Sequence, residues 1–521
     1  MPILGKLLKE GIKLRKSIEQ EKKTPFDLQK KQLLQLLSSA KQTAFGVHYN
    51  FKDIIHAIHN SKGDDTSFYD VYRETVPTFD YDKIYNEWWH RSRKGEKDVC
   101  WKGPVKYFAL SSGTSGSPSK HIPVTKAMVK AIHRTSIRQI LSLSNFKDIP
   151  SKVYGKGMVM LGGSTHLNRI GAFFEGDLSG ITASQIPFWF QHFYKPGKKI
   201  AKNTDWNSKL DEIAEKAPKW DVGFVVGVPA WIQIMMEKVI ERHNLNNIHE
   251  VWPNLMVYTH GGVSFEPYKK GFEKLLGRPI TYIETYLASE GFVAFQTHPN
   301  SNMRFVLNNG LFYEFVPFNE ENFNENGELI SNPKTYMIHE IEENKDYAIL
   351  ISTCAGAWRY LIGDTVRLTD RAKSEMIITG RTKHFLSLCG EHLSVDNMNK
   401  AIELVAHECN IDVKEFTVAG IPYENLFAHK WYIGTNDKVN LDELKTKLDN
   451  RLKELNDDYA VERSAALKEI YVETLPTDVF LNWMKMKGKE GGQNKFPRVL
   501  RRNQYQEWEQ YLNQNYRETT V

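Results

Sequence analysis

Cysteine is scarce in this 521-residue chain, and its four cysteines lie far apart. A structural zinc site usually needs closely spaced pairs of ligands, and a disulfide framework needs several cysteines in a short chain. None of the four is part of a Cys-x-x-Cys pair, so both kinds of site are disfavoured. We expect reduced thiols and a cytoplasmic protein. The cysteines are Cys100, Cys354, Cys389 and Cys409.

Long hydrophobic runs are also missing. The longest apolar run, Val222 to Met236, is too short to span a bilayer and contains Pro229. Residues Met1 to Lys23 place apolar side chains among lysines at near-helical spacing, without the unbroken apolar core of a signal peptide. We expect an amphipathic helix packed on the protein body, with a membrane-surface anchor as the alternative, and no membrane span.

Neither sign of charge dominates. The chain has 69 Lys and Arg against 63 Asp and Glu, a formal net charge of +6. Lysine groups such as Lys22–Lys23, Lys198–Lys199 and Lys485–Lys489 are scattered and are not interleaved with aromatic residues, as they are in proteins that bind single strands. We interpret them as solvated surface and expect no nucleic-acid partner.

Hydrolase and P-loop signatures do not occur. There is no Gly-x-Ser-x-Gly elbow, and the Cys, His and Asp residues show no usable triad spacing. The chain has instead the loop Ser-Ser-Gly-Thr-Ser-Gly-Ser-Pro-Ser-Lys at residues 111–120, which is not a Walker A sequence. It follows an apolar run, Tyr107 to Leu110, that predicts a strand, and a helix is expected from Thr125. Glycines, hydroxyls and a lysine can surround a polyphosphate, although composition alone also allows an exposed Ser/Gly linker.

Strand and helix signals alternate through the first three quarters of the chain, which predicts an α/β sheet. A helix is expected to begin near Pro229. From about residue 305 the pattern changes to short strands and tight turns, and then to a small α+β region. We predict a large N-terminal α/β domain with a β-rich portion, residues 1–388, and a smaller C-terminal α+β lid domain, residues 389–521. The expected strands include Val153–Leu161, Gly223–Val226, Leu255–Tyr258, Thr281–Glu284, Phe312–Val316, Tyr347–Thr353, Trp358–Leu361 and Thr365–Leu368.

Four segments follow one another in the order found in adenylate-forming enzymes, the superfamily of acyl-CoA synthetases and luciferases. The 111–120 loop resembles the phosphate loop of that superfamily. Tyr286–Glu290 resembles its aromatic-x-x-Thr/Ser-Glu motif, Tyr360–Asp364 its Tyr-x-x-Gly-Asp motif, and Gly380–Lys383 its Gly-Arg-x-Lys segment. Nearly the whole chain is similar to one branch, the auxin-responsive (Gretchen Hagen type) acyl-acid amido synthetases, and we expect a bacterial member. The segments similar to that branch are Val226–Trp231, Trp358–Asp364 and Asn494–Arg498.

The resemblance implies an ATP site with Mg²⁺. A carboxylate must attack the α-phosphate of ATP, so the site has to neutralise two approaching anions. Glu290 would bind the metal, Asp364 the ribose hydroxyls, and Tyr286 would lie against the adenine, although a core tyrosine is the alternative. Arg381 and Lys495 would be catalytic, Lys495 by moving over the α-phosphate. The remaining expected ATP-binding residues are Ser111, Ser112, Gly113, Thr114, Ser115, Lys120 and Ser289.

The pocket for the acyl substrate is less well marked. Arg134 and Arg138 lie one turn apart on the helix expected after the phosphate loop, and one of them could anchor a substrate carboxylate. Phe173, Phe174 and Trp231 are candidate apolar walls, with simple core packing as the alternative.

The resemblance implies an ATP-dependent ligase that adenylates a carboxylic acid and transfers the acyl group to an amino acid, releasing AMP and pyrophosphate. An acyl-CoA ligase with CoA as acceptor is the first alternative, and a non-catalytic nucleotide- or acyl-binding protein is the second. We expect a monomer.

Overall fold

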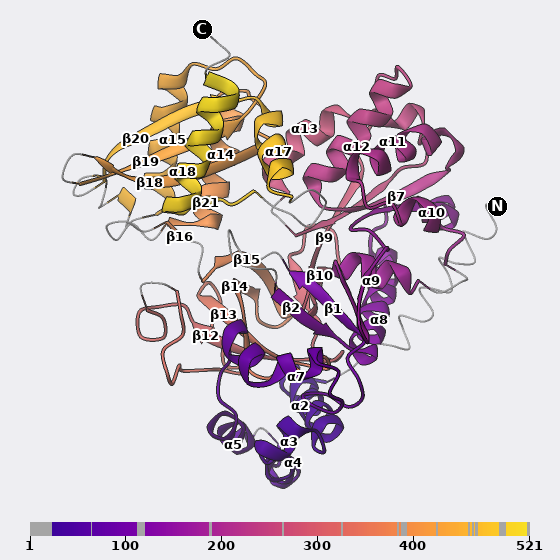
Figure 1. The fold of residues 1–521 in the computed structure, drawn as a ribbon, viewed down its shortest axis with the longest axis vertical. Helices are drawn as coiled ribbons and strands as arrows, with labels where there is room; N and C mark the ends of the chain where they lie inside the picture. The colour runs from indigo at the N-terminus through magenta and orange to yellow at the C-terminus, as the bar shows by residue number, and fades with distance from the viewer. Residues whose placement is uncertain are drawn as a thin grey trace.

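The computed structural model describes residues 23–63, 65–111, 120–186, 190–262, 265–324, 327–382, 385–386, 393–423, 426–456, 459–460, 463, 467–488 and 496–517. These residues form a large N-terminal body and a smaller C-terminal body (Figure 1). The amphipathic helix expected over Met1–Lys23 lies almost wholly outside the described residues. None of the helices in the described ranges has the length and apolar character needed to cross a membrane.

Short helices at the N-terminal end cover one end of the large body, drawn in indigo in Figure 1. The first begins at Pro25 because the Thr24 hydroxyl accepts a hydrogen bond from the N–H of Asp27 at 3.1 Å. The buried Gln29 ties this helix to the sheet by donating to the carbonyl of Leu307 at 2.7 Å. The elements are α2 (Pro25–Ala40), α3 (Ala44–His48), α4 (Phe51–Asn60), α5 (Ser67–Thr75), α6 (Tyr81–Ile84), the π-helical η1 (Tyr85–Trp89) and α7 (His90–Arg93).

An 11-stranded sheet, in the order β12-β13-β14-β15-β11-β10-β9-β8-β7-β3-β6, forms the centre of the large body. The strands from β6 to β9 are parallel, and those from β9 to β12 are antiparallel. The predicted α/β sheet with a β-rich portion is therefore confirmed. The strands are β3 (Gly157–Leu161), β6 (Tyr194–Lys195), β7 (Val222–Gly227), β8 (Val257–Gly261), β9 (Thr281–Ala288), β10 (Gly291–Gln296), β11 (Met303–Phe305), β12 (Leu311–Pro317), β13 (Asp346–Thr353), β14 (Tyr360–Asp370) and β15 (Glu375–Arg381).

Helices flank the parallel strands. Pro229 takes the first turn of α12 (Pro229–Arg242), as the sequence predicts, because its missing N–H would have no partner inside the helix. The other helices here are α10 (Lys198–Ala201), α11 (Trp206–Lys216) and α13 (Glu266–Lys274), with short 3-10 turns at η2 (Leu143–Asn145), η3 (Ser151–Gly155), η4 (Ala217–Lys219) and η5 (Ile248–Glu250).

Two strand predictions are wrong in their limits. The strand expected over Val153–Leu161 begins only after the 3-10 turn Ser151–Gly155. The two strands expected over Trp358–Leu361 and Thr365–Leu368 belong to one strand, β14. Gly363 has a φ of +88°, and the register with β13 shifts around it. Because glycine adopts this conformation without strain, the strand bulges at Gly363 and continues.

A four-stranded sheet, in the order β2-β1-β5-β4, lies beside the main sheet. Ser111 at the end of β1 pairs with Lys120 at the start of β2, so the predicted phosphate loop joins two antiparallel strands. Residues 112–119 of that loop lie outside the described residues. Thr125 caps the following helix, as predicted, by accepting from the N–H of Met128 at 3.1 Å. The elements are β1 (Tyr107–Ser111), β2 (Lys120–Val124), α8 (Lys126–Ser142), β4 (Asn168–Ile170), β5 (Phe173–Gly176) and α9 (Leu178–Ser184).

The C-terminal body is a four-stranded sheet, in the order β20-β19-β18-β21, with helices on both faces. Trp431 packs in one buried cluster with residues of α14 and α15, and its neighbour Tyr432 packs in another with residues of α17 and α18. Successive side chains of a strand point to opposite faces. The predicted α+β class of this body is confirmed. Its elements are β16 (Phe385–Leu386), β17 (Leu393–Ser394), α14 (Val395–Glu408), β18 (Glu415–Tyr423), β19 (Leu426–Gly434), α15 (Leu441–Leu455), β20 (Leu467–Leu475), α17 (Thr477–Met486), β21 (Val499–Leu500), α18 (Arg502–Leu512) and η6 (Asn513–Arg517).

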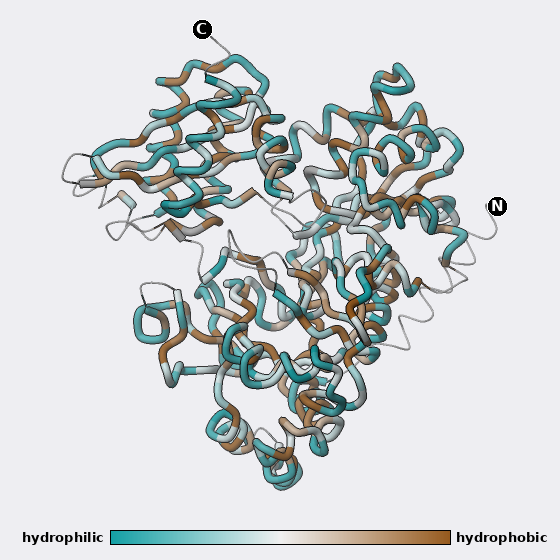
Figure 2. Tube along the Cα trace, in the orientation of Figure 1, coloured by the Kyte–Doolittle hydropathy of each residue, from teal (hydrophilic) through white to brown (hydrophobic). Residues whose placement is uncertain are grey.

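Hydrophobic and hydrophilic stretches alternate along the chain (Figure 2). The largest buried cluster joins the N-terminal helices to the antiparallel strands, and a second packs α11, α12 and α13 on the parallel strands. The C-terminal body contacts this second region. Lys414 Nζ lies 2.8 Å from Glu237 Oε1, and Lys270 donates to the side chain of Asn410 at 2.8 Å. These contacts place the C-terminal body next to α12 and α13.

Candidate active site

Asp364 and Arg381 face one another across the strand pair β14–β15. The two residues are directly opposite in the register, and Arg381 Nε lies 3.0 Å from Asp364 Oδ1. Arg381 also donates to the carbonyl of Ile362 at 3.2 Å. The Asp364 carboxylate raises the pKa of Arg381 above its ordinary value, so the guanidinium stays charged. Two segments that the sequence marked separately therefore form one ion pair.

Tyr286, near the end of β9, holds the other oxygen of the same carboxylate. Its ring is 6% exposed, and its hydroxyl donates to Asp364 Oδ2. Burial, and then the negative charge of Asp364, raise the pKa of this tyrosine well above 10, so it remains a donor. The contact fixes the direction of the Asp364 carboxylate. Packing of the Tyr286 ring against an adenine stays a prediction.

Ser289 and Glu290 form the two-residue turn between β9 and β10, because Ala288 pairs with Gly291. Glu290 is 7% exposed. Burial raises its pKa above the ordinary value, the nearby Lys120 opposes this rise, and Asp364 adds to it. A buried carboxylate close to a second carboxylate is a good place for a cation.

The side chains at this site suit a metal ion that takes most of its ligands from the substrate and from water. In the described parts of the chain no three His, Cys, Asp or Glu side chains gather as a metal cluster. Mg²⁺ is typically held by one or two carboxylates together with phosphate oxygens. Glu290 fits such a site.

Lys120 is the only residue of the predicted phosphate loop whose side chain the structure describes. Its Nζ lies 5.5 Å from the centre of the Tyr81 ring, and its charge acts on Glu290. Ser112, Gly113, Thr114, Ser115 and the catalytic candidate Lys495 lie outside the described residues, and of Ser111 only the backbone is described.

The two arginines predicted for the acyl site are both engaged by asparagines that precede β12. Arg134 Nη1 donates to Asn309 Oδ1 at 3.3 Å, and Arg138 donates to Asn308 Oδ1. Both residues lie on α8, one turn apart, as predicted. Their role in holding a carboxylate stays a prediction.

The three aromatic candidates contact different partners. Phe173 packs edge-on against Phe108 at a centroid distance of 5.0 Å, and Phe174 stacks on Tyr107 at 5.9 Å. Trp231 packs on Trp206 of α11 at 4.7 Å, within the cluster on the parallel strands. Phe173 is buried, whereas Phe174 and Trp231 are only partly buried, and both the acyl-binding role and its alternative stay predictions.

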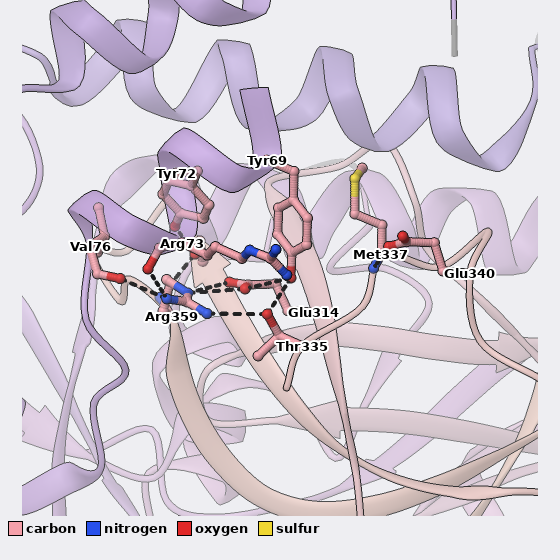
Figure 3. Close-up of polar contacts among 10 residues, drawn as sticks. Tyr69, Tyr72, Arg73, Val76, Glu314, Thr335, Met337, Glu340 and Arg359 are labelled. Atoms are coloured by element: carbon pink, nitrogen blue, oxygen red, sulfur yellow. Dashed lines mark hydrogen bonds and ion pairs between the residues drawn. The ribbon is translucent and has the colours of Figure 1, made fainter. Parts of the chain in front are cut away.

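Sequence reasoning missed a buried ion pair directly before the Tyr-x-x-Gly-Asp motif. The side chain of Arg359 is 5% exposed, and its Nε donates to both oxygens of Glu314 at 3.0 and 3.1 Å. Its Nη1 donates to the carbonyls of Arg73 and Val76 at 2.8 and 2.7 Å, and Tyr69 donates to Glu314 at 2.9 Å (Figure 3). Arg359 thus joins the end of α5 to β12 and fixes the start of β14.

One feature of the sequence indicates that such an ion pair exists. Glu314 is a single carboxylate inside the apolar strand Leu311–Pro317, and a charge at such a position needs a partner. The cationic residue that pairs with Glu314 is set by contacts between segments distant in sequence. The sequence alone therefore does not identify this residue.

The large mixed sheet, the loop-bearing hairpin and the smaller C-terminal body agree with the predicted fold class. The chain belongs to the GH3 family. Models of the GH3 family N-terminal, central and C-terminal domains match residues 14–213, 304–376 and 396–504. A search of curated proteins found no significant match.

Solved structures share the whole fold. An acyl acid amido synthetase, AtGH3.15, in complex with 2,4-DB has a TM-score of 0.75 at 17% identity, over 99% of this chain and 96% of that one. Another GH3.15 structure has a TM-score of 0.73 at 14% identity, with the same coverage. A 2-hydroxyisobutyryl-CoA ligase in the postadenylation state with 2-HIB-AMP has a TM-score of 0.60 at 12% identity, over 93% and 91%. The first two are named as amido synthetases, the predicted class, and the third is named as a CoA ligase, the first alternative.

The predicted family resemblance and fold class are therefore confirmed. The domain limits 1–388 and 389–521, the bacterial origin, the monomeric state and the cytoplasmic location stay predictions.

Proposed function

We propose that this protein is an ATP-dependent acyl-acid amido synthetase. The carboxylate of an acid attacks the α-phosphate of ATP, giving an acyl-adenylate and pyrophosphate. The amine of an amino acid then attacks the acyl carbon, and AMP leaves. Membership of the GH3 family supports the reaction class. Within the chain, the observation that carries it is the Asp364 carboxylate, held on both oxygens by Tyr286 and Arg381 beside the buried Glu290.

Each of these groups has a chemical task in the first step. The fixed Asp364 accepts hydrogen bonds from the ribose hydroxyls, and Arg381 adds positive charge next to it. Residues 111–115 and Lys120 hold the departing phosphates, and Lys495 approaches the α-phosphate. Glu290 would hold Mg²⁺, which neutralises phosphate charge when bound.

An amino acid or CoA could accept the acyl group. The matched structures named as amido synthetases favour an amine as the acceptor. The matched CoA ligase supports the alternative, in which the acceptor is the thiol of CoA. A pyrophosphate-release screen over a panel of carboxylic acids, each paired with pooled amino acids or with CoA, separates the two. We expect release that depends on an acid and an amide product with the amino-acid pool. Thioester formation with CoA alone would assign the enzyme to the alternative class.

Replacing Asp364 with Ala should weaken ATP binding by about 1.5–3 kcal/mol, because hydrogen bonds to a charged group are lost. Titration calorimetry with ATP measures this directly. Asp346→Ala is the matched control, since Asp346 pairs with Arg367 at 2.8 Å in the same sheet. Equal effects of the two substitutions would mean that Asp364 is a structural residue.

Replacing Glu290 with Gln should reduce the Mg²⁺-dependent rate at least roughly tenfold, since a metal ligand is lost. The same change should leave the unliganded protein as stable as before or more stable. Burial raises the pKa of Glu290, so its ionised form costs stability once the pH exceeds the pKa of an exposed glutamate. The gain in Tm should therefore appear near neutral pH and vanish in acid. An unchanged dependence of the rate on Mg²⁺ would refute the metal role.

A further inference from the structure

Within the described ranges, two buried hydroxyls close in sequence to the candidate site residues have no hydrogen-bond partner. Tyr360 is 0% exposed and Thr382 is 1% exposed. Among the residues that the structure describes, no group accepts from or donates to the hydroxyl of either one. Buried polar groups in folded proteins are nearly always paired, because an unpaired one loses its water without compensation. Two buried hydroxyls that no described residue satisfies are therefore candidates for ligand contacts.

Both residues lie close in sequence to the Asp364–Arg381 ion pair. Tyr360 precedes Asp364 by four residues on β14, and Thr382 directly follows Arg381 at the end of β15. The N–H of Thr382 donates to the carbonyl of Gly363 at 2.9 Å, which holds Thr382 against the motif. Tyr360 and Thr382 therefore come from the strand pair β14–β15 that also carries the ion pair.

The position of Tyr360 is firmly set. Its backbone bridges to Phe79, and its ring lies 5.4 Å from the ring of Trp89. The preceding residue, Arg359, makes the buried ion pair with Glu314. These contacts fix the place of Tyr360 in the sheet, and among the described residues its hydroxyl has no partner there.

The charges around Tyr360 indicate what its hydroxyl can bind. After burial, the carboxylate of Glu290 has the largest effect on the pKa of Tyr360, which lies well above 10, and Arg381 opposes that effect. The phenol therefore stays protonated and is a hydrogen-bond donor beside the carboxylate expected to hold the metal. Thr382 lies instead beside Gly363 and Asp364, the residues expected at the ribose.

We propose that the hydroxyls of Tyr360 and Thr382 bind the nucleotide, Tyr360 at its phosphate end and Thr382 at its ribose end. This inference rests on the proposed function and adds two substrate-binding groups to it. The Tyr360 hydroxyl donates to a phosphate oxygen or to a water of the metal. The Thr382 hydroxyl completes the hydrogen bonds around the sugar.

Tyr360→Phe and Thr382→Val remove each hydroxyl at almost constant volume. Calorimetric titration with ATP and Mg²⁺, and with AMP, needs no acid substrate and so does not depend on finding one. We expect Tyr360→Phe to weaken ATP binding about tenfold or more with little effect on AMP, and Thr382→Val to weaken both by a similar factor. Without ligand, the Tm of each variant should equal or exceed that of the wild type, because an unpaired polar group has been removed.

Tyr313→Phe is the matched control. The hydroxyl of Tyr313 is equally buried but donates to the carbonyls of Val293 and Val306 at 3.1 and 3.2 Å. Its removal should lower the Tm and leave ATP binding unchanged.

Two results would overturn the inference. One is wild-type affinity for ATP in both variants, which would mean that the hydroxyls hold only buried water. The other is a fall in Tm as large as that of Tyr313→Phe, which would mean that they have protein partners. If the wild type binds ATP but releases no pyrophosphate with any acid, the proposed function fails while the binding comparison still tests the two hydroxyls.

Discussion

Replacement of Lys495 with Ala should lower the rate of acyl-adenylate formation on the order of 10²-fold or more, the usual cost of losing one donor to a transition state. The α-phosphate gains charge as the acid attacks, and a cation that can approach it at that moment stabilises the transition state. The same variant should still convert a supplied acyl-adenylate and an amine to the amide, because adenylate-forming enzymes, which this chain resembles, rearrange the small domain for the second step.

The residues on either side of Lys495 suit that task. Phe496 is 5% exposed and packs against Phe480, Trp483 and Trp508, so the chain is anchored directly after the lysine. Gly488, Gly491 and Gly492 precede it in the sequence. Because glycine permits many backbone conformations, the sequence before Lys495 is consistent with the movement predicted for this lysine.

Lys487→Ala provides the matched control for Lys495→Ala. Lys487 belongs to the same segment, but it pairs with Glu507 in the C-terminal body. We expect its loss to leave both half-reactions unchanged. Equal losses in the two half-reactions of Lys495→Ala would show that Lys495 stabilises the small domain in general, and an unchanged rate of adenylation would show that it is a surface lysine.

Replacement of Glu314 with Ala should lower the free energy of unfolding of the large body by about 3–5 kcal/mol, because it leaves the Arg359 guanidinium buried without its counter-ion. The side chain of Glu314 is 0% exposed and that of Arg359 is 5% exposed. Urea unfolding followed by tryptophan fluorescence measures the change. Tyr69 also loses an acceptor, which adds to the effect.

An exposed ion pair in helix α5 provides the comparison with the buried pair. Asp70 and Arg73 are 2.7 Å apart with side chains 51% and 42% exposed, so Asp70→Ala should cost no more than about 1 kcal/mol. A Glu314→Ala effect as small as this would mean that water reaches Arg359. The Glu314→Met, Arg359→Met double variant should recover much of the loss, since apolar replacements of a buried pair are often well tolerated.

Local sequence patterns predicted features that lie within single segments. Thr125 and Pro229 begin helices because capping and proline effects act within one turn. The Tyr-x-x-Gly-Asp and Gly-Arg-x-Lys segments identified Asp364 and Arg381 from their immediate neighbours. That the two residues pair depends on the register of β14 and β15, which the structure supplies.

Contacts between distant segments could not be predicted in this way. Glu314 and Arg359 meet through the packing of β12, β14 and α5, and Trp231 packs on Trp206 of another helix. The limits of β14 depended on a bulge opposite β13 that only the pairing of the strands reveals. That the hydroxyls of Tyr360 and Thr382 lack a partner among the described residues is visible only in the three-dimensional structure.

The identity of the nucleotide product tests the proposed reaction most directly. The purified protein would be incubated with ATP, Mg²⁺ and the acid panel, and the nucleotides would be separated by chromatography while pyrophosphate and phosphate are assayed in parallel. If the acid is activated as an acyl-adenylate, AMP and pyrophosphate will appear in equal amounts and only when a suitable acid is present. Formation of ADP and phosphate would contradict adenylation, because it would mean that the acid attacks the γ-phosphate.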